Sequence, residues 1–507
     1  RAVELAPQEG RWQRAYGATV RMVGMLKGLT RSDYDAGMAA LEKALELEGE
    51  LAETRMEMGL LAWLRGERKR ALVYMARAVE LAPDNAEYRL NLGTAYRAAD
   101  RVQESIPHLE RALALAPDRA DAYFELGEAY RALNLPKKAE KALVRAVEME
   151  PQNSEYQFAL GQLLVSLGEW DEATEALRRA VELRPDATDW PRLLADALAA
   201  RGDLRAALIQ YERATQIEPD DAIAWHNLAA TARRLGDRAR AIQALEKALS
   251  LTPGVAEWWN EIASDLEAIG DFERAASTYK QAYTLDPERP DYLLRQSMAI
   301  FRSGDVRNAL AILHNTVSED PTFAAAYEAM GDIEWQRGNL RRAAEAYERA
   351  IAAEPRNAAY YVKLARVRRK AQRTDEAIEL LRKAVQFSPQ WAEAYAELGE
   401  LYEQRGRLDE AVQAYQQAVV SDRNNADYHL RLGRLSRRMG YDDKALAHFR
   451  IVADMEPDLA EAHYEVGLGL AKREEYDEAT RFFERAVQLA PDEPDYHFHL
   501  GLAYRQL

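Results

Sequence analysis

The amino-acid sequence predicts an all-α fold, an α-solenoid built from stacked helix-turn-helix units. Two series of residues recur with a 34-residue period. Within each period, apolar residues recur twice at helical spacing, separated by a Gly-Asp or Gly-Asn type turn. A unit of this length cannot bury its apolar face alone, so neighbouring units must stack into one continuous core.

The two series keep their register along most of the chain. The first consists of Pro83, Pro117, Pro151, Pro185, Pro219, Pro253, Pro287, Pro321, Pro355, Pro389, Pro457 and Pro491, with Arg423 in the remaining slot. The second consists of Ala71, Ala139, Ala173, Ala207, Ala241, Ala275, Ala309, Ala343, Ala377, Ala411, Ala445 and Ala479, with Ser105 as its exception. Since proline cannot continue a helix interior, it starts the turn into the next unit.

The stretch 392–423 illustrates one unit. Its expected first helix carries Tyr395, Leu398, Gly399 and Tyr402, and its expected second helix carries Ala411, Tyr415 and Ala418. The small residues let the two helices approach closely, while the aromatic rings fill the remaining space. With this pattern the chain resembles the tetratricopeptide repeat (TPR) family over nearly its whole length.

The resemblance implies a right-handed superhelix whose first helices line a concave groove and whose second helices lie outside. We expect residues 1–9 to be the tail of a preceding repeat and residues 10–51 to form an irregular 42-residue repeat. Residues 52–493 then form thirteen regular repeats, and residues 494–507 the first helix of a further one. The chain therefore resembles a segment of a longer polypeptide.

The composition excludes several classes of function. Asp and Glu number 84 against 68 Lys and Arg, for a formal net charge of −16, which argues against a nucleic-acid partner. Cysteine is absent, so disulfides, thiol nucleophiles and iron–sulfur clusters are excluded within these residues. No apolar run is long enough to span a membrane.

No catalytic motif is present, and we expect no enzyme activity and no cofactor within these residues. The one candidate for a metal site is a set of histidines at the same repeat position, His429, His463 and His497. Elsewhere this position holds a packing aromatic residue, such as Trp225 or Tyr327. We therefore predict that the histidines pack and hold no metal.

The 42-residue unit carries eight additional residues around 21–32. Eight helical residues would lengthen a helix by roughly 12 Å. The extension would expose an apolar ridge of Val23, Met25, Leu26 and Leu29. Such a ridge fits either a partner site or packing on an upstream repeat.

The groove positions implied by the resemblance lack the lysines and asparagines of a chaperone-type carboxylate clamp. They carry basic residues instead: Arg97, Arg131, Arg233, Arg234, Arg366, Arg369, Lys370, Arg434, Arg437 and Arg438. Arginine suits bidentate binding of carboxylates and stacking on aromatic rings. An acidic or aromatic-rich protein segment is therefore the favoured partner.

A second interpretation of the basic residues stays open. The sixth repeat position alternates in charge, through Lys363, Glu397, Arg431 and Glu465. Adjacent first helices could therefore cross-link through a ladder of opposite charges. The ladder and a ligand site are not mutually exclusive.

Three hypotheses for function follow. The first is a non-enzymatic scaffold in a bacterial assembly or secretion complex, since arginine far outnumbers lysine, as in products of GC-rich bacterial genes. The second is a structural protein that self-associates head to tail through its ends. The third is a TPR arm of a larger enzyme or of an exopolysaccharide-secretion machine. The sequence leaves the compartment open between bacterial cytoplasm and periplasm, and an extracellular location is open as well if the protein is polymeric.

Overall fold

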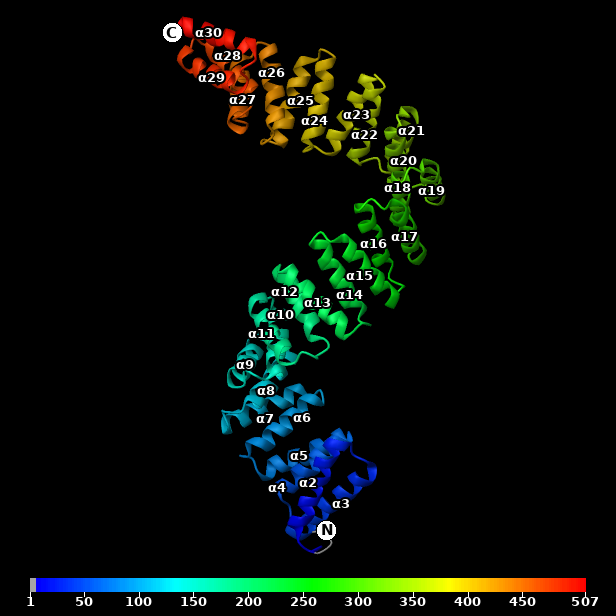
Figure 1. The fold of residues 1–507 in the computed structure, drawn as a ribbon, viewed down its shortest axis with the longest axis vertical. Coiled ribbons are helices and arrows are strands. Elements are labelled where there is room, and N and C mark those ends of the chain that lie inside the picture. Colours follow the sequence, from blue (N-terminus) through cyan, green and yellow to red (C-terminus); the bar gives the residue numbers. More distant parts are fainter. Residues whose placement is uncertain (1–5) are drawn as a thin grey trace. The chain divides into compact units, whose positions relative to one another are not determined.

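The computed structural model describes residues 6–507, which form helices α2 to α30 and no strand. The chain divides into two compact units, Arg1–Gly254 and Val255–Leu507. Each unit is a succession of helix pairs, which Figure 1 shows in the order of the chain. The all-α, stacked-pair prediction is confirmed.

From residue 6 onward, the first unit contains seven helix pairs. Its helices are α2 (Gly10–Lys27), α3 (Arg31–Glu48), α4 (Ala52–Arg65), α5 (Arg68–Leu81), α6 (Ala86–Ala98), α7 (Val102–Leu115), α8 (Ala120–Ala132), α9 (Pro136–Met149), α10 (Ser154–Leu167), α11 (Trp170–Leu183), α12 (Trp190–Arg201), α13 (Leu204–Ile217), α14 (Ala222–Arg234) and α15 (Arg238–Leu251).

The second unit repeats the same plan. Its helices are α16 (Ala256–Ala268), α17 (Phe272–Leu285), α18 (Asp291–Arg302), α19 (Val306–Glu319), α20 (Ala324–Gln336), α21 (Leu340–Ala353), α22 (Ala358–Lys370), α23 (Thr374–Phe387), α24 (Ala392–Gln404), α25 (Leu408–Ser421), α26 (Ala426–Arg438), α27 (Asp442–Met455), α28 (Ala460–Lys472), α29 (Tyr476–Leu489) and α30 (Pro494–Gln506).

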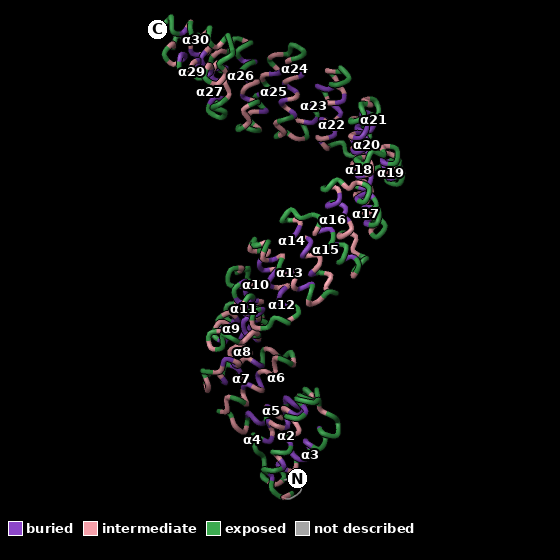
Figure 2. The backbone as a smooth tube through the Cα atoms, in the orientation of Figure 1, coloured by how far each residue is buried: buried purple, intermediate pink, exposed green. Residues whose placement is uncertain are grey.

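Even-numbered helices are the first helices of their repeats and odd-numbered helices are the second helices. Within each unit, a first helix packs on its own second helix, and that second helix packs on the next first helix. Figure 2 shows buried residues on the helices of successive pairs. The core is therefore a series of buried clusters that join neighbouring pairs inside each unit, as stacking of repeats that cannot bury their own faces requires.

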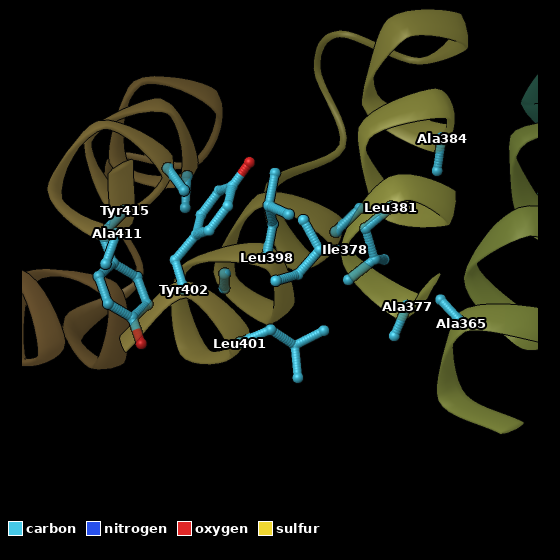
Figure 3. Packing of buried hydrophobic residues seen from close by; sticks show 14 of the residues in the cluster. Ala365, Ala377, Ile378, Leu381, Ala384, Leu398, Leu401, Tyr402, Ala411 and Tyr415 are labelled. Carbon is cyan, nitrogen blue, oxygen red and sulfur yellow. The ribbon is translucent and has the colours of Figure 1, made fainter. Parts of the chain in front are cut away.

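One close contact fixes the spacing of the helices within a pair. A Cβ atom added at Gly331 of α20 would lie 2.5 Å from the Tyr347 ring of α21. Gly399 and Tyr415 meet in the same way, at 2.8 Å. Figure 3 shows Tyr415 beside Ala411 in the buried cluster that joins α22 to α26. The glycine is required because a larger side chain would separate the two helices.

The turn inside each pair depends on one residue with a left-handed backbone. Glycine usually occupies it, as at Gly338 with φ of 77° and Gly406 with φ of 73°. Four repeats place another residue there: Asp100, Asn134, Gln372 and Glu474. Those four carry the steric cost that glycine avoids.

The irregular unit differs from the single lengthened helix that the sequence suggests. Both α2 and α3 have 18 residues, whereas most other helices have 13 or 14. Gly28 ends α2 with φ of 85°, and Thr30 caps α3 by accepting a hydrogen bond from the Asp33 amide. The added length is thus shared, and each helix gains about 6 Å.

None of the helices in residues 6–507 is long and apolar enough to cross a membrane.

Candidate partner-binding surfaces

All ten basic candidates lie on first helices, and most of them contact a neighbouring first helix. In the second unit, four of them belong to a series of ion pairs along the first helices from α20 to α28, which we call the charge ladder. It consists of Lys363, Arg366, Arg369, Arg431, Arg434 and Arg437 with the acids Glu328, Asp332, Glu393, Glu397, Glu400, Asp427, Glu461 and Glu465.

Arg366 of α22 joins α22 to α24. Its Nε donates to Glu397 Oε1 at 2.7 Å, and its Nη2 donates to Glu393 Oε1 at 2.6 Å. The planar guanidinium can bind two carboxylates at once because its donors are fixed in a fork. Arg369 adds a further contact one turn later, with Nη1 3.2 Å from Glu400 Oε2.

Lys363 joins α22 to the preceding first helix, α20. Its Nζ lies 2.6 Å from Glu328 Oε1 and 2.8 Å from Asp332 Oδ2. Burial lowers the pKa of Lys363, but the two carboxylates outweigh burial and leave that pKa raised. The Tyr347 hydroxyl of α21 donates to the same Asp332 at 2.7 Å. This carboxylate therefore connects three helices.

The ladder continues from α26 to α28. Arg434 Nε donates to Glu461 Oε1 at 2.8 Å, and Arg437 pairs with the buried Glu465. Burial raises the pKa of Glu465, while Arg437 opposes that change by stabilising the carboxylate. Arg431 lies between, with Nε 2.7 Å from Asp427 Oδ2 of its own helix.

These contacts show that the internal charge ladder exists. Every cation in it has a carboxylate partner, so the face is not a simple basic stripe. The arginines nevertheless remain accessible, since the side chains of Arg366 and Arg434 are 39% and 49% exposed. Binding of a partner by the same residues therefore stays a prediction.

The other two candidates of the second unit point back to an earlier first helix. Lys370 Nζ lies 4.6 Å from the centroid of the Trp335 ring on α20. Arg438 Nη1 lies 3.2 Å from Glu403 Oε1 on α24. Together with the ladder, these contacts bring all six second-unit candidates together with residues of neighbouring first helices.

The four candidates of the first unit are spread over α6, α8 and α14 and make contacts of different kinds. Arg97 of α6 reaches Glu125 of α8 at 2.6 Å, whereas Arg131 pairs with Glu128 of its own helix at 2.6 Å. Arg234 donates to the Ala199 carbonyl at 3.3 Å, and Arg233 is half-buried.

The candidate ridge on the irregular unit is only partly as expected. Met25 and Leu26 of α2 are strongly exposed, at 65% and 84%, and Val23 is exposed beside them. Leu29 is different, because it packs against the buried cluster around Met38. The prediction that Leu29 projects outward is therefore wrong: Gly28 ends the helix and turns Leu29 back onto the core.

The three histidines share a structural contact with the preceding turn. Nε2 of His463 lies 2.9 Å from the Pro457 carbonyl and Nε2 of His497 lies 2.8 Å from the Pro491 carbonyl. His429 contacts the Arg423 carbonyl in the same way at 3.3 Å. Other residues at this position do likewise, including Gln157, Trp225 and Tyr361. The position thus selects a side chain that can bond to the turn. His429 and His463 are buried, as the packing prediction expects, whereas His497 is exposed.

His429 also lies beside His448 of α27, with their Nδ1 atoms 3.0 Å apart. Burial lowers the pKa of His448, and the neighbouring His429 lowers it further. No group of three or more potential metal ligands occurs within residues 6–507.

Sequence reasoning missed how the acids are shared among the basic residues. The detectable signal is an acid 27 or 28 residues after the arginine, as in Arg434–Glu461 and Arg97–Glu125. It also missed the role of Tyr347, whose hydroxyl fixes Asp332 beneath Lys363.

Four tetratricopeptide repeat models match the chain. The matches span residues 124–188, 260–322 and 328–392 for one model, 164–232 and 368–435 for a second, 84–152 and 220–288 for a third, and 460–493 for the fourth. Together they cover well over half of the chain. The chain belongs to the tetratricopeptide repeat family. TPR arrays act in protein–protein contacts, so the chain is a protein-interaction scaffold in that general sense.

Solved structures that match the chain include the following three. YrrB, described as a TPR protein with an unusual peptide-binding site, is 27% identical over 35% of this chain and 92% of its own, with a TM-score of 0.34. Naa15/Naa10 bound to HypK-THB is 16% identical over 90% of this chain and 78% of its own, with a TM-score of 0.39. The APC/C hetero-tetramer Cut9-Hcn1 is 15% identical over 92% of this chain and 98% of its own, with a TM-score of 0.33. Comparison with curated proteins gave no significant match.

Proposed function

We propose that the chain is a non-enzymatic scaffold of a bacterial assembly or secretion complex that binds partner segments along the charge ladder. The favoured segments are acidic or aromatic-rich. The ladder supports this proposal because it presents accessible guanidinium groups on α22 and α26, with the carboxylates of α24 between them in the series. The bacterial setting is supported by composition, with 13 lysines among 68 basic residues.

The observation that carries the proposal is the accessibility of arginines that already hold carboxylates. Arg366 and Arg434 are 39% and 49% exposed, and their partners Glu393 and Glu461 are also accessible. An exposed ion pair contributes only about 0.2–1 kcal/mol. A carboxylate of a partner can therefore replace an internal one at small cost, while the guanidinium keeps its bidentate geometry.

Peptides selected from a random library test the proposal, because selection needs no named natural partner. Peptides are selected by phage display on the wild-type chain and then measured against Arg366→Gln/Arg369→Gln/Arg434→Gln. We expect the affinity of most selected peptides to fall about tenfold or more, since several charge-assisted hydrogen bonds are lost together.

A matched control separates the ladder from general charge effects. Arg382→Gln/Arg407→Gln removes arginines that pair within or next to second helices, Arg382 with Glu379 and Arg407 with Glu410. The control should bind the peptides like the wild type. Equal affinity of the peptides for all three proteins would exclude the charge ladder as the binding surface.

A further inference from the structure

A cleft between α8 and α9 differs from the charge ladder in place and in composition. It has a volume of about 810 Å³ and lies between the side chains of the two helices of one repeat. Its apolar part includes Leu126 and Val144, and Tyr123 and Tyr130 line it from α8. The Tyr130 hydroxyl is held by Glu110 of α7 at 2.7 Å. The size and lining are typical of a ligand site.

The rim of this cleft is basic. α9 contributes Lys137, Lys138, Lys141 and Arg145, against Glu140 and Glu148. Three of the 13 lysines of the chain thus lie within five residues. The first turn of α9 contains no acidic residue, although a helix N-terminus favours acids and disfavours cations. Helix stability therefore does not account for these lysines.

The three lysines of this rim are not held by internal ion pairs. Among residues 6–507, no carboxylate lies within ion-pair distance of Lys137, Lys138 or Lys141, while Arg145 pairs with Glu148 at 2.9 Å. Lys138 Nζ instead lies 5.3 Å from the centroid of the Tyr130 ring. Cations that make no internal ion pair can bind an anionic partner without breaking one.

The equivalent cleft six repeats later provides an internal comparison. It lies between α20 and α21 and has a volume of about 630 Å³. Arg342 and Arg349 occupy the positions of Lys138 and Arg145. The positions of Tyr130, Lys141 and Val144 are filled by Glu334, Glu345 and Glu348, so this cleft is predominantly acidic. The basic rim of α9 is therefore not repeated in this equivalent cleft, so the repeat alone does not produce it.

We propose that the α8/α9 cleft binds an acidic peptide segment of a partner protein. Carboxylates of the segment pair with Lys138, Lys141 and Arg145, and an apolar or aromatic side chain enters between Tyr123 and Tyr130. A concave site with an apolar floor suits a peptide side chain better than a flat membrane surface. The site lies in the first unit and on a second helix, so it goes beyond the binding proposed for the ladder.

A fluorescein-labelled peptide of about twelve residues, built from repeated Glu-Glu-Phe, probes the site directly. The titration uses the Arg366→Gln/Arg369→Gln/Arg434→Gln background, so that binding at the ladder does not mask the cleft. We expect saturable binding in fluorescence anisotropy, and about a tenfold rise in Kd when Lys138→Gln/Arg145→Gln is added. The control Arg342→Gln/Arg349→Gln changes the same repeat positions in the acidic cleft and should leave Kd within about twofold. Glutamine retains helix propensity close to that of lysine, so both variants should fold.

Transfer of the pattern gives a second, independent measurement. Glu345→Lys/Glu348→Val copies two α9 residues into the α20/α21 cleft and should add a second binding site to the titration.

Several results would overturn the proposal. One is the absence of saturable binding at peptide concentrations up to about 100 μM. Another is an equal change in Kd for Lys138→Gln/Arg145→Gln and for Arg342→Gln/Arg349→Gln. Tighter, lysine-dependent binding of phosphatidylserine vesicles would assign the rim to a membrane, and tighter binding of oligo(dT) would assign it to nucleic acid. Failure here leaves the ladder proposal intact, because the ladder variants change different residues in the other unit.

Discussion

At the scale of single residues, the repeat positions explain both the regularity of the array and its exceptions. Arg97 and Arg437 occupy the same repeat position, and each reaches an acid 28 residues later on the next first helix. Arg131 also occupies this position, but the residue 28 places later is Ala159. Arg131 therefore pairs inside its own helix with Glu128.

The left-handed turn position gives the first prediction. Gln372 has φ of 60°, in a conformation that glycine adopts without steric cost. Gln372→Gly should stabilise the α22–α23 pair by about 0.5–1 kcal/mol, which is the steric gain less the added freedom of the unfolded chain. Amide hydrogen exchange of α22 and α23 measures this local stability.

The reverse change at the same repeat position is the control. Gly338→Gln, at φ of 77°, should destabilise the α20–α21 pair by a similar amount. Faster exchange in α22 and α23 after Gln372→Gly would show that the left-handed backbone is not strained there.

At the scale of helices, ion pairs join elements that the apolar core already brings together. Glu50 precedes α4 and accepts hydrogen bonds from Arg77 of α5 and Arg55 of α4. The hydrogen bond from Arg77 is the largest cause that lowers the pKa of Glu50 from 4.5 to about 2. The contact therefore couples the stability of this pair to pH.

The sign of that coupling follows from proton binding. Because the folded pKa is the lower one, the unfolded state binds more protons as pH falls from 4.5 towards 2. The stabilisation from Glu50 is complete above pH 4.5 and disappears as pH falls to about 2. Glu50→Gln should therefore lower the thermal midpoint at pH 7 and have progressively less effect in acid. A difference between the two proteins that stays constant with pH would contradict this account.

The charge ladder gives a prediction about coupling between helices. In a double-mutant cycle, Arg366→Gln and Glu397→Gln should show an interaction energy of about 0.5–1 kcal/mol, measured by hydrogen exchange of α22 and α24. Glu397 is only 15% exposed, so the pair is less screened than a surface pair. The interaction should weaken as salt is added.

The comparison pair lies within one second helix. Arg382 and Glu379 of α23 are both largely exposed, at 58% and 64%, and are three residues apart. Their interaction should be about 0.2–0.5 kcal/mol. An interaction energy between Arg366 and Glu397 that is no larger than the one between Arg382 and Glu379 would mean that the ladder does not fix the register of the first helices.

At the scale of the whole molecule, the sequence predicted the architecture far better than the surface. Recurring prolines and alanines sufficed for the helix pairs, because each repeat meets the same steric demands. The surface was harder because an arginine can reach several acids: Arg366 reaches both Glu393 and Glu397. Leu29 escaped prediction because the point where α2 ends decides whether that side chain faces the core.

The most direct test of the scaffold function is amide hydrogen exchange of the chain with and without a peptide selected on it by phage display. We predict slower amide exchange in α22 and α26, which carry the arginines of the ladder, and in α24, which carries their partners Glu393, Glu397 and Glu400. We also predict that the Arg366→Gln/Arg369→Gln/Arg434→Gln variant loses this protection. Protection confined to the second helices α23, α25 and α27, or unchanged in the variant, would contradict binding along the ladder.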